Sequence, residues 1–365
     1  MKKYDIGIQT LWNVPNYGTF VQAYSLQKVI KKISGKETVQ IAHLDEKHYN
    51  FYYNYKKYLR SKKIFSKEFV KSFFYKNPDV SGKLKIFSKA YNIIPHTDII
   101  NIKNLNNFQF NKVFLGSDIL WDYSLEPFNK DRFLFGTNFN AEINSYAASF
   151  GTIPLGDKYP EYVINGLKNM KNISVRDEKS ALIVEDILGY KPDVVLDPTW
   201  LWDFSKDKNV IEPNDENYIL VYGQDFTPDF INNIIKFAKN NNLSIIGLDC
   251  NSDKYDWCDI LVHQSELDPF LWIGYFKKAS YVATSTFHGL TFSLIFKKKF
   301  AFCKTDFIMV KAKKLLEELK IMEKFLNKDD ANGMLTSYWD YEYIDMIIGK
   351  KIDSSIEFLT KSLEE

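Results

Sequence analysis

Residues 279–302 restrict the fold of this 365-residue chain more than any other stretch. Residues 281–283 form a short apolar run followed by the hydroxyl residues 284–286, a pattern typical of a buried parallel strand. Phe287, His288 and Gly289 come next, followed by a helical pattern and a second apolar run at 300–302. His288 is therefore expected at a turn from a strand to a helix. In an open α/β sheet this is the edge where ligands bind.

The chemistry of this turn suits an anionic ligand. The start of the following helix offers backbone N–H groups and the positive end of the helix dipole. Gly289 would let the backbone approach a ligand closely. We expect Ser285, Thr286, His288 and Gly289 at the site. A satisfied core histidine at position 288 is an equally good interpretation of the local pattern.

Strands and helices alternate along both halves of the chain, which predicts an α/β protein with two parallel-sheet domains. Predicted strands lie at 5–11, 39–44, 112–115, 143–150, 173–175 and 194–196, then at 218–222, 243–248, 260–262, 281–283 and 300–303. Predicted helices lie at 20–33, 178–188, 228–239, 268–278, 309–319 and 352–363. Prolines and charges between 190 and 215 predict a domain boundary near residue 205.

Two more predicted strands are followed by residues whose side chains could bind a ligand or transfer a proton. Gly116, Ser117 and Asp118 follow the strand at 112–115, and Asp118 could accept a proton or bind a hydroxyl group. An N-cap role for Asp118 is at least as compatible with the pattern. Arg176 follows the strand at 173–175 and is suited to clamp a phosphate or carboxylate. Alternatively, Arg176 forms an ion pair with Asp177 or a neighbouring residue.

Residues 47–90 combine many lysines with many aromatic residues and contain almost no acids before Asp79. A solvated helical insertion in the first domain, at about 47–95, explains this composition. A surface for anionic lipid head groups or a lipid-linked phosphate is the sharper alternative. Single-stranded nucleic acid has little else to support it.

The net charge, the cysteines and the apolar runs of the sequence exclude several classes of function. The net charge of +2 implies no bulk polyanion partner, so we expect no nucleic acid. Three cysteines without CxxC spacing predict a reducing compartment without structural disulfides, and no residue cluster predicts a metal. No apolar run suggests a signal peptide or membrane span. We expect a cytoplasmic protein, with peripheral contact at the inner face of the membrane through 47–90 as an open alternative.

Several short motifs occur in an order that resembles one family. They are Asn16-Tyr17-Gly18 with 22–27, Gly116-Ser117-Asp118 with Trp121, 174–177 with Ser180, 197–199, and 285–289 with 292–293. Together they resemble the polysaccharide pyruvyl transferase family over roughly residues 5–305.

The resemblance implies a GT-B-like fold, with two Rossmann-like domains facing a cleft. It also implies transfer of the enolpyruvyl carbon of phosphoenolpyruvate onto two hydroxyls of one sugar, which gives a cyclic pyruvate ketal. Phosphoenolpyruvate is then the donor substrate, and no cofactor is expected. The acceptor would be a sugar of a bacterial surface polysaccharide or its precursor, such as a lipid-linked intermediate.

The resemblance also implies where the substrates bind. Arg176 and His288 would line the phosphoenolpyruvate site, with further contacts from the sets 16–18, 116–117, 285–286 and 289. Many members have arginine where this chain has Thr286, although a hydroxyl residue also occurs there. One expected cation is then missing. Backbone N–H groups of Gly289 and Leu290, or an unidentified lysine, would take its place.

The residue types fit this chemistry. The methylene carbon must be protonated, and an imidazole with an unperturbed pKa of about 6.5 can carry that proton near neutral pH. We therefore expect His288 as the general acid, with Asp118 accepting a proton from the attacking hydroxyl.

The expected domains are 1–205 on the acceptor side, 206–335 on the donor side and a helical tail at 336–365 that packs back on the first domain. Two alternatives stay open. One is a GT-B glycosyltransferase that uses a nucleotide sugar, and the other is a non-catalytic homologue that binds a glycan.

Overall fold

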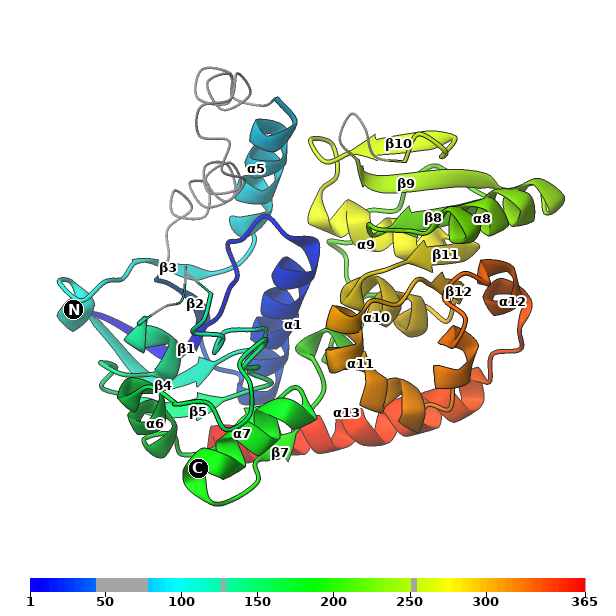
Figure 1. Cartoon of the computed structure of the whole chain (residues 1–365). Coiled ribbons are helices and arrows are strands. Elements are labelled where there is room, and N and C mark those ends of the chain that lie inside the picture. Colours follow the sequence, from blue (N-terminus) through cyan, green and yellow to red (C-terminus); the bar gives the residue numbers. More distant parts are fainter. Residues whose placement is uncertain (44–77, 126–127, 129, 251–254, 365) are drawn as a thin grey trace, which may run out of the picture. The chain divides into compact units, whose positions relative to one another are not determined.

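The computed structural model of the chain describes residues 1–43, 78–125, 128, 130–250 and 255–364 (Figure 1). It divides into two compact units. Unit 1 contains Met1–Tyr75, Ser88–Trp202 and Lys351–Glu365, and unit 2 contains Lys76–Phe87 and Asp203–Lys350. Within the predicted insertion, the structure describes only the stretch from residue 78, which includes helix α5 (Pro78–Tyr91). Residues 47–77 lie outside the described part, so the lipid-binding surface expected there stays a prediction.

Unit 1 is built on a parallel five-stranded sheet with the order β3-β2-β1-β4-β5. The strands are β1 (Lys2–Gln9), β2 (Thr38–Ala42), β3 (His96–Ile99), β4 (Phe108–Leu115) and β5 (Glu142–Ser145). Beyond β5 the short strands β6 (Ser174–Val175) and β7 (Asp193–Val194) pair with each other. Isolated bridges join Asn144 to Asn172 and Ala148 to Val175, so this edge continues the sheet.

Helices cover both faces of the unit 1 sheet. On one face, Ile6 and Ile8 of β1 pack with Leu26 and Val29 of α1 (Tyr17–Ser34). Leu359 and Leu363 of α13 (Tyr341–Glu364) belong to the same cluster. On the other face, buried residues of β2 and β4 pack with those of α6 (Glu161–Lys168) and α7 (Glu178–Leu188). The strands β1 and β4 are most deeply buried in their carboxyl-terminal halves, where residues 6–9 and 113–115 are all buried.

Unit 2 repeats this plan with a parallel sheet in the order β10-β9-β8-β11-β12. The strands are β8 (Tyr218–Tyr222), β9 (Ser244–Cys250), β10 (Ile260–His263), β11 (Tyr281–Thr284) and β12 (Lys299–Phe302). The helices are α8 (Pro228–Asn240), α9 (Pro269–Lys278), α10 (Phe287–Ile295), α11 (Asp306–Glu318) and α12 (Ala331–Thr336). Short 3-10 helices occur in unit 1 at Leu105–Asn107, Arg132–Phe135 and Pro198–Leu201, and in unit 2 at Met322–Phe325. The predicted α/β fold with two parallel sheets is confirmed.

Aromatic side chains hold helices on both faces of the unit 2 sheet. Phe237 of α8 meets Tyr281 of β11, with ring centroids 5.0 Å apart. Trp272 of α9 meets Tyr222 of β8 at 5.2 Å. Tyr281 of β11 lies opposite Ile219 of β8, and Ile219 is three residues before Tyr222. Because side chains alternate along a strand, Tyr222 and Tyr281 point to opposite faces of the sheet. Trp272 also contacts Phe292 of α10 at 5.0 Å, which joins the two helices on that face.

Several predicted boundaries differ from the structure, among them those of the first strand and the last helix, and for two others a local reason is evident. The first helix begins at Tyr17 rather than residue 20, because the side chain of Asn16 caps it by accepting a hydrogen bond from the Thr19 amide at 3.1 Å. The strand predicted at 143–150 ends at Ser145, because Ala147 has a positive φ of 52°, which extended backbone does not allow. Among the described helices, none combines the length and apolar character that crossing a bilayer requires.

Candidate functional site

The two sheets share one strand order, so each has a single switch point at which its winding reverses. It lies between β1 and β4 in unit 1 and between β8 and β11 in unit 2. Open α/β sheets bind ligands beyond the carboxyl ends of their strands at this point. The loops that follow these four strands are therefore the candidate site of each unit.

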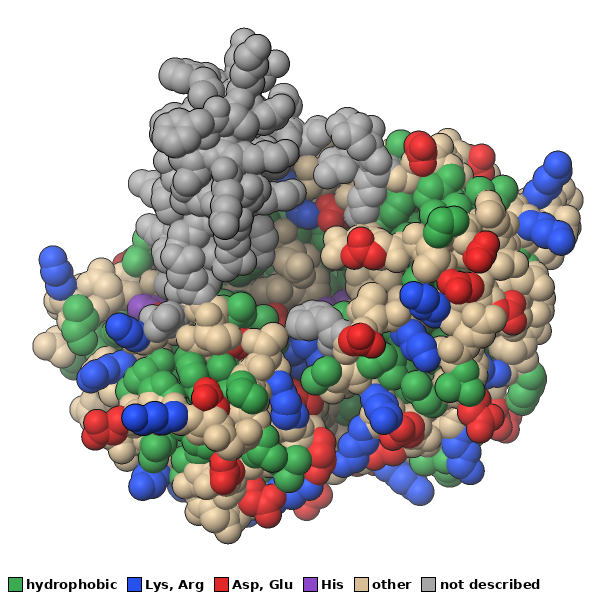
Figure 2. Space-filling model, in the orientation of Figure 1, with side chains coloured by type: hydrophobic (Ala, Val, Ile, Leu, Met, Phe, Trp, Pro, Cys, Tyr) green, Lys and Arg blue, Asp and Glu red, His purple; other side chains and the backbone are tan. Residues whose placement is uncertain are grey.

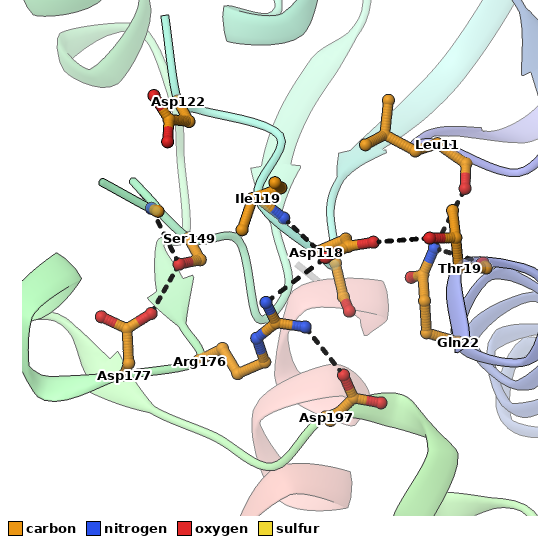
Figure 3. A network of polar contacts seen from close by, with 12 residues as sticks. Leu11, Thr19, Gln22, Asp118, Ile119, Asp122, Ser149, Arg176, Asp177 and Asp197 are labelled. Atoms are coloured by element: carbon orange, nitrogen blue, oxygen red, sulfur yellow. Dashed lines mark hydrogen bonds and ion pairs between the residues drawn. The ribbon is translucent and has the colours of Figure 1, made fainter. Parts of the chain in front are cut away.

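Asp118 lies in the loop after β4, and contacts from several elements fix its carboxylate (Figure 3). Its backbone is left-handed, with φ of 76°. One oxygen, Oδ1, accepts a hydrogen bond from the Ile119 amide at 2.9 Å. The other, Oδ2, accepts one from the hydroxyl of Thr19 in α1 at 3.1 Å. Asp118 thus lies at the switch point of unit 1, with its side chain only 12% exposed.

Arg176 joins Asp118 to a second acid. Its Nη2 lies 3.4 Å from Oδ1 of Asp118, and its Nη1 donates to Oδ2 of Asp197 at 3.0 Å. The exposed fractions are 4% for the Arg176 side chain and 1% for that of Asp197. Asp197 also accepts hydrogen bonds at Oδ1 from the amide and hydroxyl of Thr199. We call Asp118, Arg176 and Asp197 the acid–arginine cluster.

The carboxylates of this cluster keep the arginine charged. Burial acts most strongly on the pKa of Arg176 and lowers it, but Asp118, Asp197 and Asp177 together outweigh burial, so the pKa is raised. The sequence left open an ion pair of Arg176 with Asp177 or a neighbour, and the structure shows the pairs with Asp118 and Asp197. The Asp177 carboxylate instead caps α7 through the Ser180 amide and accepts from the Ser149 hydroxyl at 2.6 Å.

Gly116 and Ser117 were expected to contact substrate. Packing within unit 1 accounts for the glycine at position 116 and for the burial of the Ser117 side chain. A Cβ at Gly116 would lie 2.3 Å from the carbonyl oxygen of Tyr146, and its φ is 114°. Glycine is needed there because β4 meets the segment after β5. Ser117 is fully buried, with no hydrogen-bond partner for Oγ among the described residues. In this structure the Ser117 side chain is not accessible to a ligand.

Replacing Gly116 with alanine should lower the free energy of unfolding by about 1–3 kcal/mol. Gly35 is a matched control, because it also has a positive φ, 66°, but nothing lies within 4 Å of its added Cβ. Gly35→Ala should cost about 1 kcal/mol or less, the backbone term alone. Urea unfolding of both variants measures the difference. Equal losses would show that the contact with Tyr146 carries no cost.

The other expected contacts in unit 1 come from the start of α1. Asn16 is partly occupied as the helix cap, and Tyr17 is 1% exposed. Gly18 is a buried residue of the first helical turn. Of these three, Asn16 is the one exposed at the surface, so it is the best placed to meet a ligand.

In unit 2, the loop after β11 braces the loop after β8. The hydroxyl of Ser285 accepts from the Gln224 amide at 2.8 Å and donates to the Gln224 carbonyl at 2.7 Å. Thr284 donates to the carbonyl oxygen of Tyr222 at 2.6 Å. Ser285 is 5% exposed. It therefore joins the two loops of the switch point.

Thr286 caps α10 and uses the two amides that were expected to bind an anion. Its hydroxyl accepts from the Gly289 amide at 2.9 Å, and its carbonyl accepts from the Leu290 amide at 3.0 Å. A Cβ at Gly289 would lie 2.0 Å from the hydroxyl oxygen of Thr284. In this structure the hydroxyl and carbonyl oxygens of Thr286 therefore engage both amides. That Gly289 and Thr286 contact a ligand stays a prediction.

His288 lies in the first turn of α10, just beyond β11, and is partly exposed. Its ring meets Phe287 edge-on, with centroids 5.3 Å apart. The first turn of α10 contains no acidic residue. A partly exposed imidazole at the positive end of a helix can hold a proton near an anionic ligand. The catalytic role of His288 stays a prediction.

Sequence reasoning gave no site role to two residues of this network. Asp197 directly follows a predicted strand and Asp118 comes three residues after one, so both lie beyond strand ends, and that position was the available signal. Thr19 lay in a predicted loop, so nothing in the sequence linked it to Asp118. Gln22 of α1 extends the network by donating to the carbonyls of Leu11 and Thr19.

The described residues also show whether a metal site or an extended basic surface is present among them. No group of three or more His, Cys, Asp or Glu side chains among them is placed to hold a metal ion. On the face drawn in Figure 2, basic and acidic side chains are interspersed, so the described part forms no extended basic surface there.

Comparison with known proteins agrees with this architecture. A putative UDP-N-acetylglucosamine 2-epimerase from Listeria monocytogenes superposes with a TM-score of 0.51 at 10% identity, covering 97% of each chain. UDP-GlcNAc 2-epimerase from Neisseria meningitidis, solved with UDP-GlcNAc, gives 0.50 at 12% identity, covering 99% of this chain and 100% of that one. At these identities the likeness concerns the fold alone, which is GT-B-like. None of the curated proteins matches the chain.

The family is settled by sequence. The loops after β4, β8 and β11 fall within residues 16–306, and the model of the family described as Polysaccharide pyruvyl transferase matches this range, most of the chain. The motifs at 16–18, 116–118, 174–177, 197–199 and 285–289 all lie inside it. With these motifs at the strand ends of two parallel sheets, the chain belongs to the polysaccharide pyruvyl transferase family.

Proposed function

We propose that this transferase moves the enolpyruvyl carbon of phosphoenolpyruvate onto two hydroxyl groups of one sugar, which forms a cyclic pyruvate ketal and releases phosphate. The observation that carries the proposal is the family match, because it spans the segments after β4, β8 and β11, which hold Asp118 and His288. The sugar would belong to a bacterial surface polysaccharide or its precursor. The chemistry needs no cofactor beyond the donor substrate.

The proposed mechanism assigns one proton transfer to each unit. His288 donates a proton to the methylene carbon of phosphoenolpyruvate, which leaves an oxocarbenium-like centre at the adjacent carbon. A sugar hydroxyl attacks this centre, and its proton passes to Asp118. The second hydroxyl then displaces phosphate and closes the ketal ring, and its proton leaves with the phosphate.

Electrostatics support this division of roles. The first turn of α10 carries His288 and no acid, so the helix dipole favours the anionic donor there. The acid–arginine cluster holds two carboxylates and one guanidinium, so it favours a hydroxyl group that donates a hydrogen bond. These preferences match an anionic donor and an uncharged acceptor.

Calorimetric titration with phosphoenolpyruvate tests the donor. We expect saturable binding to the wild type, and phosphate release when phosphoenolpyruvate is mixed with a panel of methyl pyranosides. UDP, ADP and UDP-GlcNAc serve as comparison ligands. Binding of a nucleotide sugar without any binding of phosphoenolpyruvate would overturn the proposal in favour of a glycosyltransferase. Binding of phosphoenolpyruvate without phosphate release from any pyranoside would favour a non-catalytic homologue.

A further inference from the structure

The acid–arginine cluster carries more negative than positive charge. Asp118 and Asp197 contact Arg176, so two carboxylates share one guanidinium. Asp177, the residue next to Arg176, adds a third carboxylate close enough to raise the pKa of the arginine. An anionic ligand brought to Arg176 would be repelled by these acids at short range, in surroundings that screen charge poorly.

The guanidinium is also committed to partners inside the protein. Nη1 donates to Asp197 and Nη2 faces Asp118, which occupies both ends of the planar group. The Arg176 side chain is 4% exposed. A phosphate or carboxylate that takes over either end of the group must displace the acid bound there. The displaced acid would then lose a buried partner, which is costly.

What this arrangement does fix is the position of Asp118. Arg176, at the end of β6, holds Oδ1, while Thr19 of α1 donates to Oδ2. The Ile119 amide also donates to Oδ1, and the left-handed backbone of Asp118 aims the side chain toward both partners (Figure 3). Groups from separate elements therefore set one carboxylate at the switch point of the sheet.

We propose that Arg176 is a positioning residue that holds the Asp118 carboxylate for an uncharged sugar hydroxyl, and that it does not bind the anionic donor. The inference rests on the proposed function. It differs from the expectation that the family resemblance gave, in which Arg176 lines the phosphoenolpyruvate site.

Two substitutions separate these roles. Arg176→Lys keeps the positive charge but loses the planar, two-ended geometry. Asp197→Asn removes one competing acid and leaves Arg176 and Asp118 in place. Arg132→Lys is the matched control, because Arg132 is an exposed arginine of the same unit. Circular dichroism and urea unfolding verify that each variant is folded before binding is measured.

We expect the dissociation constant for phosphoenolpyruvate to change less than about 3-fold in Arg176→Lys and Asp197→Asn. With the methyl pyranoside that supports the fastest phosphate release, kcat should fall about 10- to 100-fold in Arg176→Lys, because a misplaced catalytic group loses rate. KM for phosphoenolpyruvate should stay unchanged. Arg132→Lys should match the wild type in all three measurements.

The opposite results overturn the inference. If Arg176 binds the donor, Arg176→Lys should weaken phosphoenolpyruvate binding about 10-fold or more, and Asp197→Asn should tighten it by freeing the guanidinium. In that case the proposed function still stands. If the wild type binds no phosphoenolpyruvate at all, the proposed function fails and this inference fails with it.

Discussion

Arg176→Met should lower the free energy of unfolding by about 3–5 kcal/mol, which is the cost of removing one partner from a buried ion pair. Asp197 is 1% exposed and Asp118 is 12% exposed at the side chain, so water cannot readily replace the lost cation. Urea unfolding followed by circular dichroism measures the loss. Arg132→Met, at an exposed arginine, should change stability by no more than about 0.5 kcal/mol.

A triple variant isolates the cause. Arg176→Met combined with Asp118→Asn and Asp197→Asn removes all three charges of the acid–arginine cluster, so it should regain most of the lost stability. Asparagine at position 197 can still accept hydrogen bonds from Thr199. If the triple variant is less stable than Arg176→Met alone, packing of the arginine stem rather than its charge explains the loss.

His288→Ala should reduce phosphate release by about 10²- to 10⁴-fold, the usual contribution of a positioned general acid. The dissociation constant for phosphoenolpyruvate should change much less, because the helix dipole of α10 remains. Single-turnover phosphate release and calorimetry measure the two quantities separately. His288→Gln keeps a hydrogen-bond donor but cannot carry the proton, so its rate should be as low as that of the alanine variant.

His96 offers a matched control for this prediction. It is an exposed histidine of β3 in unit 1, and His96→Ala should leave phosphate release unchanged. A rate for His288→Ala within about 3-fold of the wild type would remove the imidazole from the chemistry. His288 would then be the satisfied structural histidine that the sequence pattern equally allowed.

Many elements were predictable because their strands are buried on both faces, whereas β3, α6 and α12 were not predicted. Strands such as 218–222 read as uninterrupted apolar runs, and helix α7 was predicted with its observed bounds because Asp177 caps its start and Gly189 follows its end. The boundary at Ser145 was not predictable, since Ala147 is left-handed although alanine, unlike glycine or asparagine, gives no signal for that conformation.

The polar partners were harder to predict than the elements. Asp118 and Arg176 were named separately, but the sequence separates them by 58 residues and gives no sign that they meet. Asp197 was noted only as part of a motif. Parallel strands bring such positions to one edge, and the sequence shows which residues end strands without showing which strands are neighbours. Strand order was therefore the missing information.

The last helix has a consequence for how the protein forms. Leu359 and Leu363 of α13 complete the apolar cluster around Ile6 and Ile8 of the first strand. A ribosome adds about 5–20 residues per second, so roughly 10–30 s pass between the synthesis of residue 202 and that of residue 363. During this interval one face of the first sheet is covered by α1 but lacks the part of its cover that α13 provides. The nascent first domain is thus a natural client for chaperones that shield apolar surface.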